Sequence, residues 1–312
     1  MNHFVQLIPF LGILIIYGLL YSVTKALVAY YQLKKRRSPF VGNFLRSPGE
    51  SIRWQLGDLS DDVSVHLLSA LVLPLIFYAS ILTQAYFGGQ AFSVPSIWIL
   101  ILVAAAFETY TIHRLILSIK KRRTLRLGYE GGLAVGQELN RLLREGYDVY
   151  HDFPADHFNI DHIIVGPAGV YAVETKARQK PTTGSGRSDA KVFYDGKKLQ
   201  FPDWTETKPL EQARRQAQWL SKWLSSAVGA SIDVQPVITL PGWYVERTSA
   251  NGFPVINPKN FRSILKSSKT KPLDTSMVTR IVHQIDQRCR DVRPRAGDGL
   301  GGKPGLLDKE NA

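Results

Sequence analysis

The chain has 312 residues, of which 45% are hydrophobic, and its 39 Lys and Arg against 26 Asp and Glu give a formal charge of +13. Its single cysteine excludes an internal disulfide, and no cluster of His and Cys suits zinc. The basic excess favours polyanionic partners, either anionic lipid head groups or nucleic acid phosphates, so the position of the charges along the chain has to distinguish them.

Three long apolar stretches occupy the N-terminal third, at residues 4–23, 66–87 and 96–119. The first carries no charge over about twenty residues, which is long enough to cross the hydrocarbon core of a bilayer. A cleaved signal peptide is the alternative, but the stretch lacks a basic start and a small-residue cleavage site. The short link at residues 88–95 predicts a helical hairpin for the other two. We therefore expect residues 1–125 to form three transmembrane helices.

Two basic clusters predict the orientation of this region. Residues 34–37 follow the first stretch, residues 120–123 follow the third, and the link between the second and third stretches is uncharged. Because Lys and Arg are retained on the cytosolic side of a membrane, the N-terminus is expected outside and everything beyond Lys120 in the cytosol. The chain is thus predicted to be a multi-pass protein of the plasma membrane, which in a bacterium is the inner membrane, with the lipid bilayer as a partner.

Beyond Gly128 the patterns change to those of an α/β domain, expected at residues 128–292, with a mixed central β-sheet flanked by helices. A tail at 293–312, rich in Gly, Pro and charge, is expected to be disordered. In chain order the expected elements are a helix opening after Gly128, Gly131 and Gly132, a strand at 147–151, a loop at 152–158, strands at 159–165 and 170–176, a hairpin at 191–201, a helix at 209–228, strands at 232–240 and 252–258, a helical turn at 260–265 and a helix at 276–292.

The runs 159–165 and 170–176 flank the turn residues 166–169 and therefore predict a β-hairpin. If the turn is symmetric, counting back along both strands places Asp161 directly opposite Glu174. Side chains in opposed positions lie close together, and two like charges there are destabilising unless a cation lies between them. The hairpin therefore predicts a cation site at its open end.

Carboxylate oxygens that leave room for water and substrate phosphates suit Mg²⁺ or Mn²⁺ better than zinc. Lys176 lies two residues after Glu174 and so shares its face of the strand, where an ammonium group can steady a phosphate. A Glu-x-Lys run on an exposed strand is the alternative, as an ordinary solvated face. The apolar neighbours on the same face, Ile163, Val165, Val170 and Ala172, favour a buried stripe that ends in the carboxylates.

These motifs resemble the nuclease-related domain (NERD) family, itself similar to the PD-(D/E)XK nucleases. The resemblance extends from about Gly128 to Phe261 and is carried by the opening helix at 131–139, the runs 158–162 and 169–176, and the helix that contains Gln212 and Gln216. It implies a restriction-endonuclease-like fold in which Asp161 and Glu174 hold Mg²⁺ (or Mn²⁺). It also implies that Lys176 assists the attacking water and that a phosphodiester bond of nucleic acid is hydrolysed.

The chain departs from this family at Gly131-Gly132, where members commonly have Gly-Glu. Glu130 or Glu138 would then supply a further carboxylate, and Glu138 is expected to be the third metal ligand. The departure also leaves open a catalytically inactive nucleic-acid-binding or scaffold module tethered to the membrane.

A basic segment follows the predicted site. From Lys176 to Lys222 there are eleven Lys and Arg against five Asp and Glu. Phosphate contacts require such a surface, and Gln212, Arg215 and Arg187 are expected to bind substrate, with DNA favoured over RNA. The alternative is that the basic residues only solvate the domain or contact anionic lipid. The favoured function is a membrane-anchored, metal-dependent nuclease.

Overall fold

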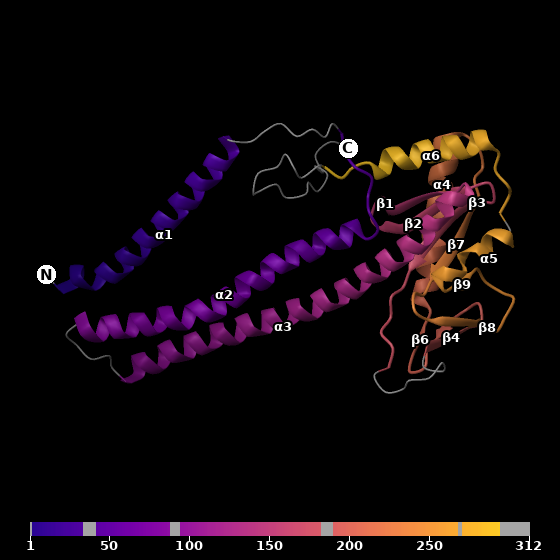
Figure 1. Ribbon diagram of the computed structural model, residues 1–312. Helices are drawn as coiled ribbons and strands as arrows, with labels where there is room; N and C mark the ends of the chain where they lie inside the picture. The colour runs from indigo at the N-terminus through magenta and orange to yellow at the C-terminus, as the bar shows by residue number, and fades with distance from the viewer. Residues whose placement is uncertain (1, 34–41, 88–93, 182–189, 268–269, 294–312) are drawn as a thin grey trace. The chain divides into compact units, whose positions relative to one another are not determined.

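The computed structural model describes residues 2–33, 42–87, 94–181, 190–267 and 270–293 (Figure 1). The predicted tail at 293–312 and the hairpin link at 88–95 fall almost entirely outside these ranges. Contacts divide the chain into two compact units. The first consists of Met1–Gly42, Leu56–Arg123 and Pro294–Ala312, and the second of Asn43–Gln55 and Thr124–Arg293. The second unit thus contains a segment, Asn43–Gln55, that the sequence places in the membrane region.

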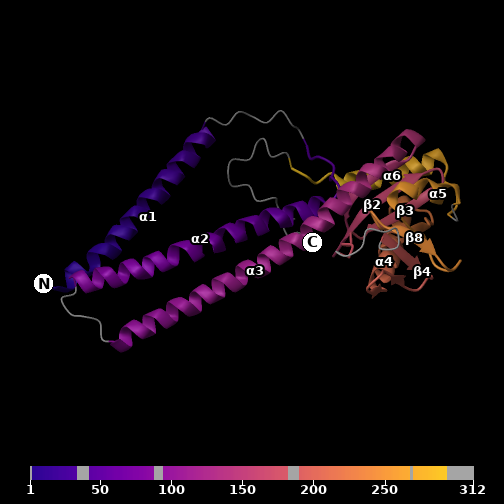
Figure 2. The same cartoon turned by 60° about the horizontal axis from the view of Figure 1, so that its bottom comes forward.

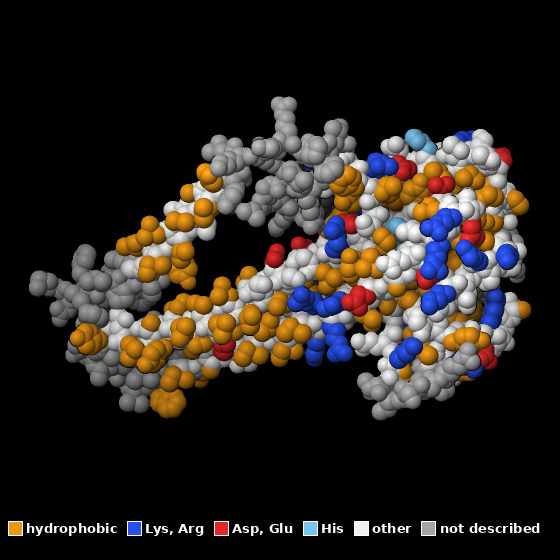
Figure 3. Space-filling view, in the orientation of Figure 1, with side chains coloured by type: hydrophobic (Ala, Val, Ile, Leu, Met, Phe, Trp, Pro, Cys, Tyr) orange, Lys and Arg blue, Asp and Glu red, His pale blue; other side chains and the backbone are white. Residues whose placement is uncertain are grey.

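The first unit is built from long helices, α1 (Asn2–Leu33), most of α2 (Glu50–Phe87) and the first part of α3 (Val94–Leu139). By length and composition, two stretches are long and apolar enough to cross a membrane, Glu50–Thr83 and Ile101–Glu145. In α1 only the shorter apolar stretch Ile15–Leu27 is found within the described residues. Two of the three predicted spans therefore have a candidate helix. Helices α2 and α3 run side by side (Figure 2), and hydrophobic side chains cover much of both (Figure 3).

Helix α3 continues to Leu139 through Gly128, Gly131 and Gly132, where the sequence predicts the start of a separate helix. The glycines serve close packing instead. A Cβ atom at Gly131 would lie 2.6 Å from the Cβ of Ala177, a distance that real Cβ atoms essentially never show. Gly131 therefore lets α3 pass directly against the residue that follows Lys176.

The second unit has the predicted mixed sheet, with strand order β1-β2-β3-β7-β9. Strand β2 (Asn159–Gly166) is antiparallel to both of its neighbours, β1 (Asp148–Pro154) and β3 (Gly169–Thr175), whereas β7 (Val234–Thr239) and β9 (Val255–Ile256) run parallel to β3. A second sheet has the order β6-β5-β4-β8, in which the antiparallel β4–β5 pair is the predicted hairpin at 191–201 and the pairings with β6 and β8 are not predicted from the sequence. Its strands are β4 (Lys191–Tyr194), β5 (Leu199–Gln200), β6 (Thr205–Glu206) and β8 (Tyr244–Arg247).

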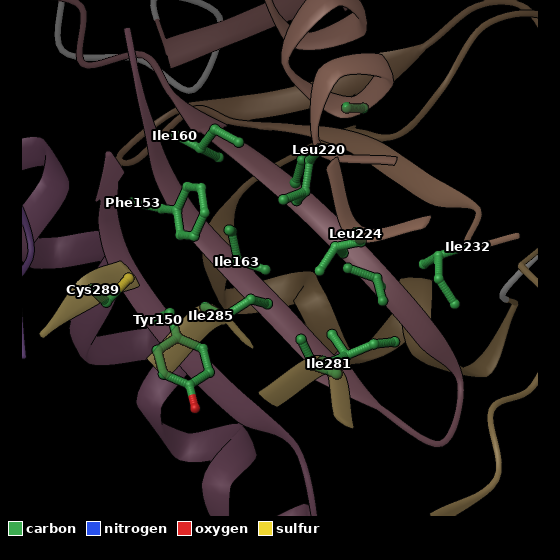
Figure 4. Close-up of a cluster of buried hydrophobic side chains, with 14 of the residues drawn as sticks. Tyr150, Phe153, Ile160, Ile163, Leu220, Leu224, Ile232, Ile281, Ile285 and Cys289 are labelled. Carbon is green, nitrogen blue, oxygen red and sulfur yellow. The ribbon is translucent and has the colours of Figure 1, made fainter. Parts of the chain in front are cut away.

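Helices cover both faces of the mixed sheet. On one face α4 (Lys208–Val228) and α6 (Thr275–Cys289) enclose a core that includes Ile163, Leu220 and Ile281 (Figure 4). On the other face the end of α3, η1 (Asn140–Glu145) and α5 (Phe261–Lys266, after η3 at Pro258–Asn260) enclose a core built around Tyr171. Both faces of the sheet are therefore shielded from water, which makes charged side chains on the sheet unusual.

Helix α4 follows its predicted pattern. The buried apolar stripe consists of Leu210, Ala213, Ala217, Leu220 and Leu224. The polar side, which is exposed to solvent, consists of Arg214, Arg215, Gln218 and Lys222. Because the period of 3.6 residues puts these sets on opposite sides, α4 presents its basic residues to solvent while it packs on the sheet. Helix α6 ends at Cys289, three residues before the predicted end.

Candidate active site

The register of the β2–β3 hairpin brings the predicted residues together. Val165 pairs with Val170, as predicted, and pairing continues to His162 with Val173. At the next position Asp161 Oδ2 accepts a hydrogen bond of 2.7 Å from the backbone N–H of Thr175. The two strands are thus still joined at their open end, by a side chain in place of the backbone ladder.

Glu174 and Lys176 form the centre of the site. The Glu174 side chain is only 2% exposed, and its Oε1 lies 2.6 Å from the ammonium Nζ of Lys176. The same ammonium donates a hydrogen bond of 2.9 Å to Oε1 of Gln212, which comes from α4. Lys176 is therefore held between the sheet and α4 by its hydrogen bond to Gln212.

Two buried oxygen atoms near this end of the sheet have no hydrogen-bond partner among the described residues, Glu174 Oε2 and Gln216 Oε1. The amide nitrogen of Gln216 donates to the backbone carbonyl of Asn159 at 3.2 Å, so this side chain is anchored. A buried acceptor without a donor is costly, and a carboxylate oxygen more so than a neutral one. The arrangement offers acceptor oxygens to a group that brings donors or positive charge.

The direction of the Asp161 pKa shift also indicates a site that would accept positive charge. Burial and the neighbouring Glu174 carboxylate raise the pKa of Asp161 well above its ordinary value, although the Thr175 N–H and Lys176 oppose the shift. Two carboxylates in this position resist being ionised together, and a divalent cation would remove the conflict. The oxygen ligands offered here, two carboxylates of which one has an oxygen without a hydrogen-bond partner, fit the chemistry of Mg²⁺ or Mn²⁺.

The third predicted ligand is not gathered with this pair. Glu138 forms an ion pair with Arg141 of η1 at 3.2 Å, and Glu130 pairs with Arg126 at 2.9 Å on the exposed side of α3. Within the part of the chain that the structure describes, no group of three or more His, Cys, Asp or Glu could hold a metal ion. The remaining positions around a cation at Asp161 and Glu174 would have to be filled by water or substrate.

Of the two predicted substrate-binding arginines, Arg187 lies outside the described residues, and Arg215 is exposed on α4. Arg215 is three residues after Gln212, so it lies about one turn along α4 from the site. A hollow of about 600 Å³ runs along α4 and β7 and is lined in part by Arg214, Ser221 and Lys222. Lys and Arg side chains gather over the face of this unit that Figure 3 shows.

At the neighbouring end of β1 lies a polar group around Asp152 that the sequence does not predict. The carboxylate of Asp152 accepts hydrogen bonds from Asn159 and from Ser51, and it forms an ion pair with Arg46. Its charge contributes to the raised pKa of Asp161, after burial and Glu174. No local pattern marks such a group, because Ser51 and Arg46 are about a hundred residues away in the sequence.

Residues 127–241 match the model of a known family, described as NERD, Nuclease-related domain. No curated protein and no solved structure matches the chain. The matched segment contains β1, β2, β3, α4 and β7, and with them every residue that contacts Lys176 or Asp161 in the site described above. Residues 127–241 of the chain are therefore similar to the nuclease-related domain.

Proposed function

We propose that this protein is a membrane-anchored, divalent-metal-dependent nuclease that hydrolyses phosphodiester bonds of nucleic acid, with DNA as the favoured substrate. The proposal rests on the contacts of the two carboxylate oxygens of Glu174. One of its buried oxygens contacts the Lys176 ammonium at 2.6 Å, and the other has no partner among the described residues, beside an Asp161 with a raised pKa. Such perturbed groups are characteristic of functional sites.

Each residue of the site has a separate role in the proposed hydrolysis. Asp161 and Glu174 would hold Mg²⁺ or Mn²⁺, which supplies a Lewis acid for a phosphate oxygen and for the attacking water. Gln212 fixes the direction of the Lys176 side chain through the 2.9 Å hydrogen bond, so the ammonium faces the site without having to reorganise. Lys176 then stabilises negative charge on the phosphate or the entering water, and Arg215 contacts a neighbouring backbone phosphate.

The proposed membrane anchor rests on α2 and α3. Several of their large apolar side chains are more than half exposed in the first unit, among them Leu68, Leu71, Leu75 and Leu102. A surface of this kind is expected to contact lipid. Because the two ends of a helical hairpin lie on the same side of a membrane, the basic cluster at 120–123 supports a cytosolic position for residues 127–241. An outside N-terminus additionally requires α1 to cross.

Cleavage assays on the full chain in lipid nanodiscs test the proposal. Labelled single- and double-stranded DNA and RNA are incubated with Mg²⁺, with Mn²⁺ or with EDTA. We expect metal-dependent cleavage that falls about 10²–10³-fold in Glu174→Gln and Lys176→Met, because each variant removes a group that acts on the transition state. Arg126→Gln, in an exposed ion pair of α3, is the matched control.

Equal cleavage by wild type, Glu174→Gln and Lys176→Met would exclude the assigned chemistry. DNA binding without cleavage by the wild type under every metal condition would instead support the inactive binding or scaffold module.

A further inference from the structure

The segment Asn43–Gln55 lies between α1 and the apolar part of α2, yet it belongs to the second unit. Phe44 and Val292 form an antiparallel bridge, with hydrogen bonds of 2.7 and 3.1 Å. The backbone N–H of Arg46 donates to the carbonyl of Cys289 at 3.1 Å. The segment is therefore fixed to the residues that end and follow α6.

The side chain of Arg46 joins this segment to the sheet. It is buried, at 9% exposure, and its Nε and Nη2 donate to the Asp291 carboxylate at 2.8 and 2.6 Å. Its Nη1 donates to both the carbonyl and the carboxylate of Asp152, at 3.2 and 3.1 Å. A planar guanidinium is suited to hold two carboxylates in fixed directions, which a lysine ammonium is not.

Asp152 is the residue through which this contact reaches the strand of the site. Its φ of 49° is uncommon for a residue other than glycine, so the surrounding contacts have to hold it there. The backbone N–H and hydroxyl of Ser51 donate to its carboxylate at 2.8 and 2.7 Å, and the Asn159 amide donates at 3.2 Å. Asn159 opens β2, two residues before Asp161, and its carbonyl accepts from Gln216.

We propose that Arg46 and Ser51 are positioning residues of the candidate site. Through Asp152 and Asn159 they fix the end of β2 that carries Asp161, so that the segment before α2 completes the site from outside the region that matches the nuclease-related domain. The effect on catalysis rests on the proposed function, whereas the effect on the position of Asp161 can be measured without any activity.

Hydrogen–deuterium exchange on the full chain in nanodiscs tests this inference, with overlapping peptides that isolate Thr175. The N–H of Thr175 reports on Asp161 because the Asp161 carboxylate is its acceptor. In Ser51→Ala and Arg46→Lys we expect the Thr175 amide to exchange about tenfold faster, in line with the 10–100-fold effects of lost support around a site. The Mg²⁺ concentration that gives half-maximal cleavage should rise by a similar factor.

Ser225→Ala is the matched control. It also removes a serine hydroxyl that makes a hydrogen bond, here by accepting from the backbone N–H of Ile232 at 2.9 Å, but it lies in α4 and does not contact Asp152. Faster exchange confined to residues 44–51 and 289–292, with Thr175 unchanged, would overturn the proposal. Faster exchange at Thr175 in a protein that cleaves no nucleic acid would support the positioning role while the proposed nuclease activity fails.

Discussion

The second unit contains two groups of one cation with two carboxylates, and they differ in how many of their carboxylate oxygens accept a hydrogen bond. In the first, Arg46 lies between Asp152 and Asp291. Each of the four carboxylate oxygens accepts at least one hydrogen bond, from Arg46, Ser51 or Asn159. Although burial disfavours the charged guanidinium, the carboxylates outweigh it, and the pKa of Arg46 is raised.

In the second group, Lys176 accompanies Asp161 and Glu174, so the formal charge is again −1, but Glu174 Oε2 has no partner among the described residues. The burial of the two groups is similar, and the difference lies in their hydrogen bonds. Fully satisfied buried charges hold a structure together and require nothing further. A buried carboxylate oxygen without a donor is costly, and a ligand that completes it would stabilise the site, which is why we propose a structural role for the first group and a chemical one for the second.

The largest effect is expected from Arg46→Met, which leaves two carboxylates without their guanidinium. Breaking a buried ion pair by removing one partner typically costs about 3–5 kcal/mol of unfolding free energy. Chemical denaturation of the full chain in detergent, followed by tryptophan fluorescence, measures the loss. Arg126→Met breaks the exposed Arg126–Glu130 pair and should cost no more than about 1 kcal/mol. Equal losses in the two variants would show that the first group is not structural.

Addition of metal is expected to affect only the second group. A ligand that binds the folded state at a hundred times its Kd stabilises it by about 2.7 kcal/mol. Titration of Mg²⁺ or Mn²⁺ into metal-free protein should therefore raise the unfolding midpoint of the wild type and of Asp291→Asn, and removal of the metal with EDTA should reverse the rise. Glu174→Gln should lose most of the effect. A rise that survives in Glu174→Gln would place the metal elsewhere.

The parts of this site that the sequence predicts are those that leave a local pattern. Alternating β-branched residues and the turn at 166–169 fix the hairpin register, which is why Asp161 and Glu174 could be paired from the sequence. The 3.6-residue stripe of α4 likewise predicts which residues are exposed and that Gln212 flanks the buried side. Periodicity carries such information because each strand or helix repeats it several times.

Other parts leave no pattern. The ion pair of Arg46 with Asp152 joins residues 106 positions apart, and nothing near either residue indicates the other. The glycines of α3 suggest a helix boundary, yet the structure uses Gly131 for its close approach to Ala177. In the second sheet the hairpin of β4 and β5 is predicted from its turn, whereas β6 has only two residues and is too short to show alternation.

A smaller effect is expected from pH in the metal-free protein. Because the pKa of Asp161 is raised above its ordinary 3.8, the folded state binds the proton more tightly than the unfolded state, and stability falls as pH rises through the interval between the two pKa values. Asp161→Asn should therefore be more stable than wild type at neutral pH, and the difference should close as pH falls through this interval. Differential scanning calorimetry from pH 4 to 8 measures it.

This difference isolates Asp161 from the other buried groups that titrate. Burial lowers the pKa of His151 to about 4, so both proteins lose stability as the pH falls from about 6.5 toward that value, and the loss cancels in the comparison. Saturating Mg²⁺ should reverse the order of the two proteins at neutral pH, because only the wild type retains both carboxylates. If Asp161→Asn is the less stable protein at neutral pH without metal, the two groups do not differ as we argue.

The smallest effect is expected from Arg215→Gln, which tests whether the second group faces nucleic acid. One lost phosphate contact reduces the dependence of log binding constant on log salt concentration by about 0.9. Binding is measured by fluorescence anisotropy at several salt concentrations in the Glu174→Gln background, so that cleavage does not interfere. Arg262→Gln, in α5 on the opposite face of the sheet, removes the same charge and should leave the slope unchanged. Equal slopes in the two variants would mean that DNA binding depends on the overall charge of the unit. The exposed side of α4 would then not be a specific DNA-binding surface.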